Sequence, residues 1–446
     1  MDTDLQKALD ALSRDDVIKL TRDVIDIPSP MGGEKALADF LAGRFRDLGV
    51  DVMVQEVEPG RPNVIATYKG TGKGTAGGAS LMLFGHMDTT WAGDEEGVRE
   101  LGPGYQPSSY MEGDWIYGAG AYNMKSGLAS AIAAFEAIVR SGVSLAGDLI
   151  MACVVGETCH TQIGRYQGAR YRGCGVGASF MVGNGVSADM AVCPEPTSGR
   201  VSIASGGYVY FEIKITGNPG ATYARGGDEI QVKPAVDAIE QSQHILAAIR
   251  DWAPGYKQAH LYRGQEATNV AVVAMEAGHP WRPTKLAPFS RIYLEVDTVP
   301  GQRVIDVVRE VEALMEDCRT RDPELDLDLK VIQTPDGAEV AEDEYVVGAM
   351  SRAHSAVHGN APEVTFDSWV ADTATMIRAG IPAICYGPAG RSAFGGSGYY
   401  PVEGEHADAD DLYKGSQVYI HLALEACNLP REQLREHREQ PARRAL

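Results

Sequence analysis

The sequence is poor in basic residues and has no long apolar run. Its 446 residues include 61 acidic and 40 basic side chains, which gives a formal net charge of −21. Because nucleic acids and anionic membranes are bound by clustered Lys and Arg, this balance argues against both as partners. The apolar runs are far shorter than the roughly 20 residues that span a bilayer. Since the N-terminus also lacks the pattern of a signal peptide, we expect a cytoplasmic protein.

Cysteine is sparse and irregularly spaced. The seven cysteines lie between Cys153 and Cys427 without any Cys-x-x-Cys pair. An odd number at such spacings fits reduced thiols better than a disulfide framework or a structural zinc cluster. We expect no essential disulfide.

The chain is too long for one ordinary hydrophobic core, so two domains are expected. Helical and strand-like patterns alternate in residues 1–205 and again in 333–446, as in an α/β domain. Between them, residues 206–332 follow a βαββαβ-like order typical of an α+β domain inserted into the first.

Apolar periodicity places the main elements of the α/β domain. Helices are predicted at Leu5–Ile27, Glu34–Leu48 and Leu128–Arg140. Continuous apolar runs predict buried strands at Leu81–Phe84, Leu149–Val155 and Met190–Cys193.

Polar side chains follow each of these three strands. His86 and Asp88 follow the first, and because residues two apart on a strand point the same way, they leave it on one face. Glu157 follows the second strand and Glu195 the third. Ligands of open α/β sheets bind beyond the carboxyl ends of the strands, so we expect these groups to share a site.

Together with Asn123 and His406 in loops, these are the residue types of a divalent-metal hydrolase. An imidazole such as His86 binds a metal through one nitrogen, while Asp88 fixes its tautomer or orients the backbone. Glu157 suits a general base that takes a proton from water activated by the metal. A structural role as a turn residue stays open for Asn123.

These residues lie in motifs that resemble the M20 family of metallopeptidases and amidohydrolases over nearly the full length. The motifs are Gly85-His86-Met87-Asp88-Thr89, Gly118-Ala119-Gly120-Ala121 with Met124-Lys125, Glu157, Ala188-Asp189 before Pro194-Glu195-Pro196-Thr197, and Glu405-His406. The resemblance implies a mixed-sheet, zinc-peptidase-like catalytic domain. It also implies an inserted ferredoxin-like lid through which a homo-oligomer, at least a dimer, forms. His86, Glu195, Asn123 and His406 are then the expected metal ligands, and Glu157 and Asp88 the catalytic residues.

The sequence departs from the family at two metal positions. The family usually has an Asp that bridges two metals where this chain has Asn123, and a second Glu where it has Thr158. Two dications about 3.5 Å apart repel by on the order of 20 kcal/mol at an effective dielectric of about 20, so an anionic bridge matters. We therefore predict one labile ion, Mn or Zn, held by His86 and Glu195. His160 is an alternative replacement ligand, and His406 is left as a weak ligand or a group near the substrate.

Two further departures lie in the inserted domain. The segment Gly217-Asn218-Pro219-Gly220-Ala221 lacks the family's oxyanion-binding His, and Glu295-Val296-Asp297 lacks its Arg. Losing an oxyanion donor typically costs about 100- to 1000-fold in rate. These changes indicate an altered reaction. Asn269 and Arg391 are the expected substrate contacts.

The predicted reaction is hydrolysis of a C–N bond. In the metal-binding and oxyanion-binding residues that it lacks, the chain looks similar to the branch of the family that includes 5-nitroanthranilic acid aminohydrolase. Our first reading is therefore deamination of an aromatic amine such as 5-nitroanthranilate, giving 5-nitrosalicylate and ammonia. One alternative is a conventional deacylase or carboxypeptidase acting on N-acyl amino acids or dipeptides. Another is a catalytically inactive binding protein.

Overall fold

The chain forms two compact units in a computed structural model that describes residues 3–72, 77–98, 102–218, 220–222, 235–367, 369–388 and 404–439. The first unit comprises segments 1–204, 339–366 and 371–446, and the second comprises 205–338 and 367–370. The predicted class, an α/β unit with an inserted α+β unit, is confirmed. Within the described residues, every helix is too short or too polar to cross a membrane.

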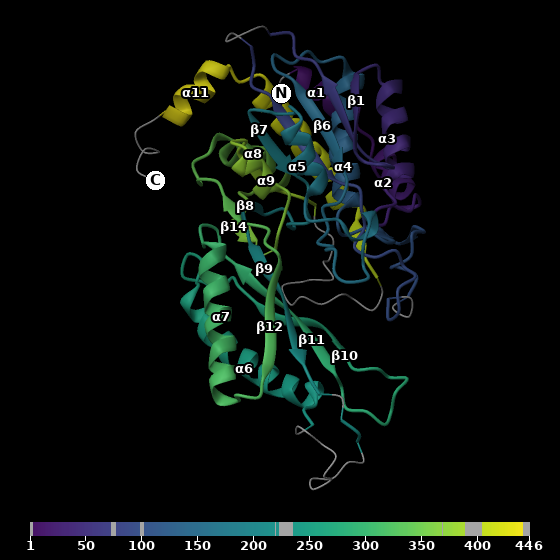
Figure 1. Cartoon of the computed structure of the whole chain (residues 1–446). Coiled ribbons are helices and arrows are strands. Elements are labelled where there is room, and N and C mark those ends of the chain that lie inside the picture. The colour runs from purple at the N-terminus through teal and green to yellow at the C-terminus, as the bar shows by residue number, and fades with distance from the viewer. Residues whose placement is uncertain are drawn as a thin grey trace. The chain divides into compact units, whose positions relative to one another are not determined.

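The main sheet contains nine strands in the order β1-β2-β6-β3-β7-β15-β8-β13, with β14 paired to β8 (Figure 1). β3 pairs in parallel with both β6 and β7, and β7 pairs in parallel with β15. The carboxyl ends of these four strands therefore reach the same edge of the sheet. The bounds are β1 (Asp51–Glu58), β2 (Arg61–Tyr68), β3 (Leu81–His86), β6 (Leu149–Val154), β7 (Met190–Cys193), β8 (Val201–Ser205), β13 (Ala338–Glu339), β14 (Val364–Asp367) and β15 (Ala383–Cys385).

Helices cover both faces of this sheet. Leu81 and Leu83 of β3 belong to one apolar cluster with α1, α2, α3, α4, α8 and α10. Met82 and Phe84 belong to another, with α5 and α9. Burial on both faces explains why β3 and β6 are continuous apolar runs. The bounds are α1 (Thr3–Asp10), α2 (Arg14–Ile25), α3 (Lys35–Asp47), α4 (Lys125–Ser141), α5 (Val176–Gly183), α8 (Tyr345–His358), α9 (Thr373–Arg378), α10 (Ala409–Cys427) and α11 (Arg431–Glu439).

The first predicted helix, Leu5–Ile27, is wrong as a single element. The chain forms α1 and α2 instead, and the Ser13 side chain accepts a hydrogen bond from the N–H of Asp16. Such a cap satisfies an N–H group that would lack a partner at the start of a helix, so it favours a break there.

A small sheet of order β16-β5-β4 completes the first unit. It consists of β4 (Tyr110–Glu112), β5 (Trp115–Tyr117) and β16 (His406–Asp408). A short 3-10 helix, Ala169–Tyr171, lies in the loop after β6. The small sheet joins the chain before α4 to the chain before α10, because His406 pairs with Tyr117.

The second unit has the predicted β-α-β-β-α-β order. Its antiparallel sheet runs β10-β11-β9-β12, so β10 and β12 are edge strands. Alternate side chains of β9 and β11, such as Phe211 and Leu294, pack in one cluster with α6 and α7. Figure 1 shows these helices on one face of the sheet. The bounds are β9 (Gly207–Thr216), α6 (Ala238–Ala259), β10 (Val270–Ala277), β11 (Phe289–Thr298), α7 (Val304–Arg321) and β12 (Asp326–Gln333).

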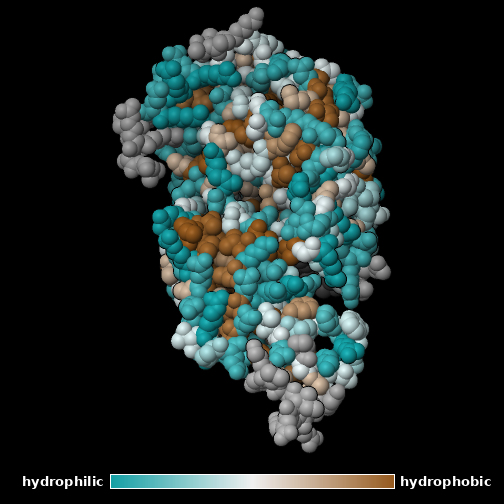
Figure 2. Space-filling view, in the orientation of Figure 1, coloured by the Kyte–Doolittle hydropathy of each residue, from teal (hydrophilic) through white to brown (hydrophobic). Residues whose placement is uncertain are grey.

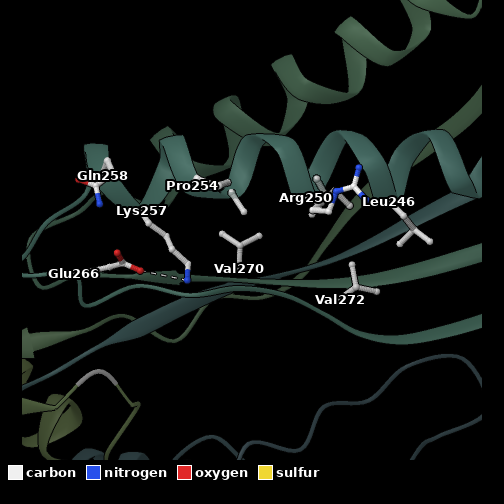
Figure 3. Close-up of a pocket in the computed structure, with 10 residues that line it drawn as sticks. Leu246, Arg250, Pro254, Lys257, Gln258, Glu266, Val270 and Val272 are labelled. Atoms are coloured by element: carbon white, nitrogen blue, oxygen red, sulfur yellow. Dashed lines mark ion pairs between the residues drawn. The ribbon is translucent and has the colours of Figure 1, made fainter. Parts of the chain in front are cut away.

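The second unit also carries exposed apolar surface. Figure 2 shows hydrophobic side chains over α7 and β12, where Ile305 is 48% and Val331 37% exposed. A pocket of about 490 Å³ lies between α6 and β10, lined by apolar residues such as Leu246 and Val270. Lys257 and Glu266 pair at 3.4 Å in its wall (Figure 3). None of the predicted site residues that the structure describes lines this pocket.

Close backbone contacts fix the end of β7. An ideal Cβ on Gly127 of α4 would lie 2.0 Å from the carbonyl oxygen of Pro194, and one on Gly387 would lie 2.0 Å from that of Glu195. Only glycine fits such approaches without displacing the backbone. Gly127 and Gly387 thus hold the segment that carries Glu195.

We predict opposite effects for two Gly→Ala changes in helices. Gly43→Ala in α3, where an ideal Cβ meets nothing within 4 Å, should raise the free energy of unfolding by about 0.5–1 kcal/mol, because Ala has the higher helix propensity. Gly127→Ala should lower it by about 1–3 kcal/mol through overpacking. Chemical denaturation measures both, and equal stabilisation by the two variants would contradict this account of α4.

Candidate metal centre

The imidazole of His86 is fully buried at the end of β3. Its Nδ1 lies 2.9 Å from the main-chain oxygen of Asp88. Its Nε2 lies 3.0 Å from Oδ1 of Asn123 and 3.6 Å from a carboxylate oxygen of each of Glu157 and Glu195. One nitrogen therefore faces the backbone and the other faces three oxygen-bearing side chains.

The hydrogen-bonding roles of these atoms are compatible with a bound cation. A carbonyl oxygen only accepts, so Nδ1 donates to Asp88 and the lone pair of a neutral imidazole lies on Nε2. That lone pair faces oxygen atoms that are acceptors themselves. His86, Glu157 and Glu195 offer donor atoms that all lie within 4.8 Å of one another, and they form the single such group in the part of the chain described here. One imidazole with carboxylates fits Zn or Mn.

Asp88 connects β3 to the end of β6. Its buried carboxylate accepts hydrogen bonds from the N–H of Glu157 at 3.1 Å, the N–H of Thr158 at 3.0 Å and the Thr158 hydroxyl at 2.8 Å. Burial alone would raise the pKa of Asp88, but His86 and these hydrogen bonds outweigh it and lower the pKa. Asp88 thus orients His86 through its carbonyl and the segment of Glu157 through its carboxylate.

Two buried charged residues hold the loop of Asn123. The carboxylate of Glu405 accepts from the N–H groups of Tyr122 and Asn123, both at 3.3 Å. Burial raises the pKa of Glu405 to about 7. Lys125 donates to the carbonyl of Val24 in the last turn of α2 at 2.9 Å and to that of Ile27, just beyond the helix, at 2.8 Å. Burial lowers the pKa of Lys125 to about 7. No local pattern indicates these contacts, because they join segments far apart in the chain.

A further acid, Asp372, lies close to the centre and was missed by sequence reasoning. It is buried at the start of α9. Burial raises its pKa to about 7; His86 opposes this effect, while Asp88 and Glu195 add to it. Burial also raises the pKa of Glu157 well above its usual value, with contributions from Glu195 and Asp372. In the sequence, Asp before a short helix indicates only an N-cap.

The two other candidate histidines do not join the donor group. His406 is buried between Trp115 and Tyr117, with ring centroids 5.1 Å from each, and its Nδ1 lies 3.0 Å from the Gly404 oxygen. The ring of His160 is hydrogen-bonded to the Arg170 carbonyl at 2.8 Å. Neither imidazole lies in the group formed by His86, Glu157 and Glu195.

The structure does not test the two predicted substrate contacts, Asn269 and Arg391. Asn269 is exposed in the second unit, where its N–H donates to the carboxylate of Asp297 at 2.9 Å. Arg391 lies outside the described residues. Their role in substrate binding stays a prediction.

Comparison with known proteins decides the family. The model of peptidase family M20/M25/M40 matches residues 82–425. The chain belongs to this family. The prediction made from the motifs is thereby confirmed, and the protein is a metal-dependent hydrolase of C–N bonds.

The chain is also similar to individual proteins, with sequence identities from 15% to 30%. The N-formyl-4-amino-5-aminomethyl-2-methylpyrimidine deformylase of Bacillus subtilis is 24% identical over 86% of this chain and 89% of its own. An acetylornithine deacetylase of Yersinia pseudotuberculosis is 30% identical over 52% of this chain and 56% of its own. The B. subtilis protein YxeP, described as a dinuclear metal-binding M20 peptidase, has the same fold, with a TM-score of 0.60 and 15% identity over 92% of this chain and 98% of its own.

Proposed function

We propose that this M20 protein removes a small acyl group, such as formyl or acetyl, from the nitrogen of a small molecule. The relatives that support the proposal are a deformylase that matches most of the chain and a deacetylase. They favour the conventional amidohydrolase over our first reading, deamination of an aromatic amine. The observation that carries the proposal is the buried group of His86, Glu157 and Glu195.

The geometry supports a division of roles. His86, Glu195 and Asn123 would hold the ion, which when bound would polarise the substrate carbonyl and lower the pKa of water. Glu157 takes the proton of the attacking water and passes it to the leaving nitrogen. Burial raises the pKa of Glu157, which makes its carboxylate a stronger base toward water. Asp88 keeps Glu157 in place through the main-chain N–H.

We further propose that one labile ion, Mn or Zn, is bound per chain. Asn123 is neutral, the Thr158 hydroxyl already donates to Asp88, and His406 lies outside the donor group. A second dication would therefore lack the anionic ligands that offset repulsion between two ions.

Metal analysis tests this proposal. The parent protein should hold at most about one ion per chain. His86→Ala should remove it, while the matched variant His406→Ala should leave the dissociation constant within about threefold, because His406 is not among the clustered donors. Two tightly bound ions in the parent protein, or loss of the ion in His406→Ala, would contradict the assignment.

A substrate panel separates the reactions. N-formyl and N-acetyl amines should be hydrolysed, and 5-nitroanthranilate should release no ammonia. Glu157→Gln should lower kcat about 100- to 10,000-fold because the general base is lost, while its metal content stays that of the parent. Release of ammonia from 5-nitroanthranilate would instead support the hypothesis that the protein is a deaminase. Unchanged turnover in Glu157→Gln would exclude Glu157 as the general base. It would favour the alternative hypothesis of a catalytically inactive binding protein.

The remaining expectations concern partners and location. We propose that the second unit acts as a lid and that two copies associate through the free edge of β10, where Val273 and Met275 are exposed. Unpaired edge strands with apolar side chains pair readily with another strand. A cytoplasmic location stays a prediction from the sequence.

Light scattering in solution tests the association. The parent protein should have the mass of at least a dimer, and Val273→Lys on β10 should lower the mass to that of the monomer. Val331→Lys on the opposite edge strand, β12, is the matched control and should leave the mass unchanged. A monomeric parent protein would refute the expectation.

A further inference from the structure

Asp372 is a buried acid whose carboxylate is not fully hydrogen-bonded by the described residues. Its side chain is 3% exposed, and its Oδ2 has no hydrogen-bond partner among the described residues. Although it precedes α9, its side chain makes no capping hydrogen bond to that helix. Burying a carboxylate without a partner is costly, so a purely structural role does not account for it.

The position of Asp372 links it to the candidate metal centre. The charged groups that affect its carboxylate are His86, Asp88 and Glu195, and it in turn affects Glu157. Oδ1 of Asp372 would lie 2.6 Å from a Cβ on Gly175, and the N–H of Gly175 donates at 2.9 Å to the carbonyl of Gly156, the residue before Glu157. Asp372 is therefore held near the donors by packing.

Among the described groups whose charges act on Asp372, two are acids, Asp88 and Glu195, and one is an imidazole, His86. Asp88 accepts three hydrogen bonds, which stabilise its negative charge. Glu157, Glu195 and Asp372 are further buried acids, and the nearby imidazole of His86 is the cationic candidate among the described groups that act on Asp372. A divalent cation at Nε2 of His86 would offset this excess of negative charge.

We propose that Asp372 belongs to the metal centre as an outer anionic group, which strengthens binding of the ion without being one of its ligands. The donor atoms within 4.8 Å of one another do not include Asp372, so it acts through its charge and not through a direct bond. Asn123, the amide beside His86, brings no charge, and Asp372 supplies one. The inference rests on the metal-dependent function proposed above.

The test is Asp372→Asn, which removes the charge at nearly constant volume. Isothermal titration of metal-free protein with Mn²⁺ should show binding weakened about 10- to 100-fold, the usual effect of removing a partner outside the ligand set. Chemical denaturation of the same metal-free variant should show stability equal to or above that of the parent, because an unpaired buried charge is gone. A structural carboxylate would give the opposite change in stability.

Asp189→Asn is the matched control. Asp189 lies just before β7, at the end away from Glu195, and accepts from the N–H and hydroxyl of Ser80 at 2.7 and 2.8 Å. This variant should lose stability and keep the parent affinity for Mn²⁺. If Asp372→Asn binds Mn²⁺ within twofold of the parent, or is destabilised as Asp189→Asn is, the inference is overturned while the proposed function stands. A parent protein that binds no Mn²⁺ or Zn²⁺ overturns both.

Discussion

The parallel pairing of β3 with β6 and β7 is the constraint on which the rest of the site depends. Parallel strands end at one edge of a sheet, so His86, Glu157 and Glu195 meet although Glu195 lies 109 positions after His86 in the chain. Helices bury both faces of these strands, which leaves the strand ends as the place where polar groups gather. Asp88 then fixes the spacing between β3 and β6 by accepting hydrogen bonds across the gap.

Concentrating acids at one sheet edge works against folding. Glu157, Glu195, Asp372 and Glu405 are all buried, and burial raises the pKa of Glu157, Asp372 and Glu405. The large apolar clusters on both faces of the sheet offset this cost, and a bound cation reduces it further. The arrangement is typical of functional sites, where local stability is lower than in the surrounding core.

The sequence predicts those parts of the site that follow from local pattern. The buried strands were recognisable as apolar runs, and His86, Glu157 and Glu195 were recognisable because they follow them directly. Asp372 and Glu405 act across contacts between distant segments, and no periodicity in their own neighbourhood shows that. The break between α1 and α2 was missed because apolar spacing continues through it, whereas the capping Ser13 interrupts the helix.

Charge balance connects the number of ions to the neutral side chains at the site. The charge of Asp88 is stabilised by three hydrogen bonds, and Glu157 has to remain available to accept a proton. Under the proposed assignment, the buried acids Glu195 and Asp372 would contribute two negative charges, which one divalent ion would neutralise. A second ion would need further anions, but Asn123 is neutral and Thr158 is engaged with Asp88. The same reasoning favours a labile ion over a tightly held pair, because affinity for divalent metals falls as anionic ligands are lost.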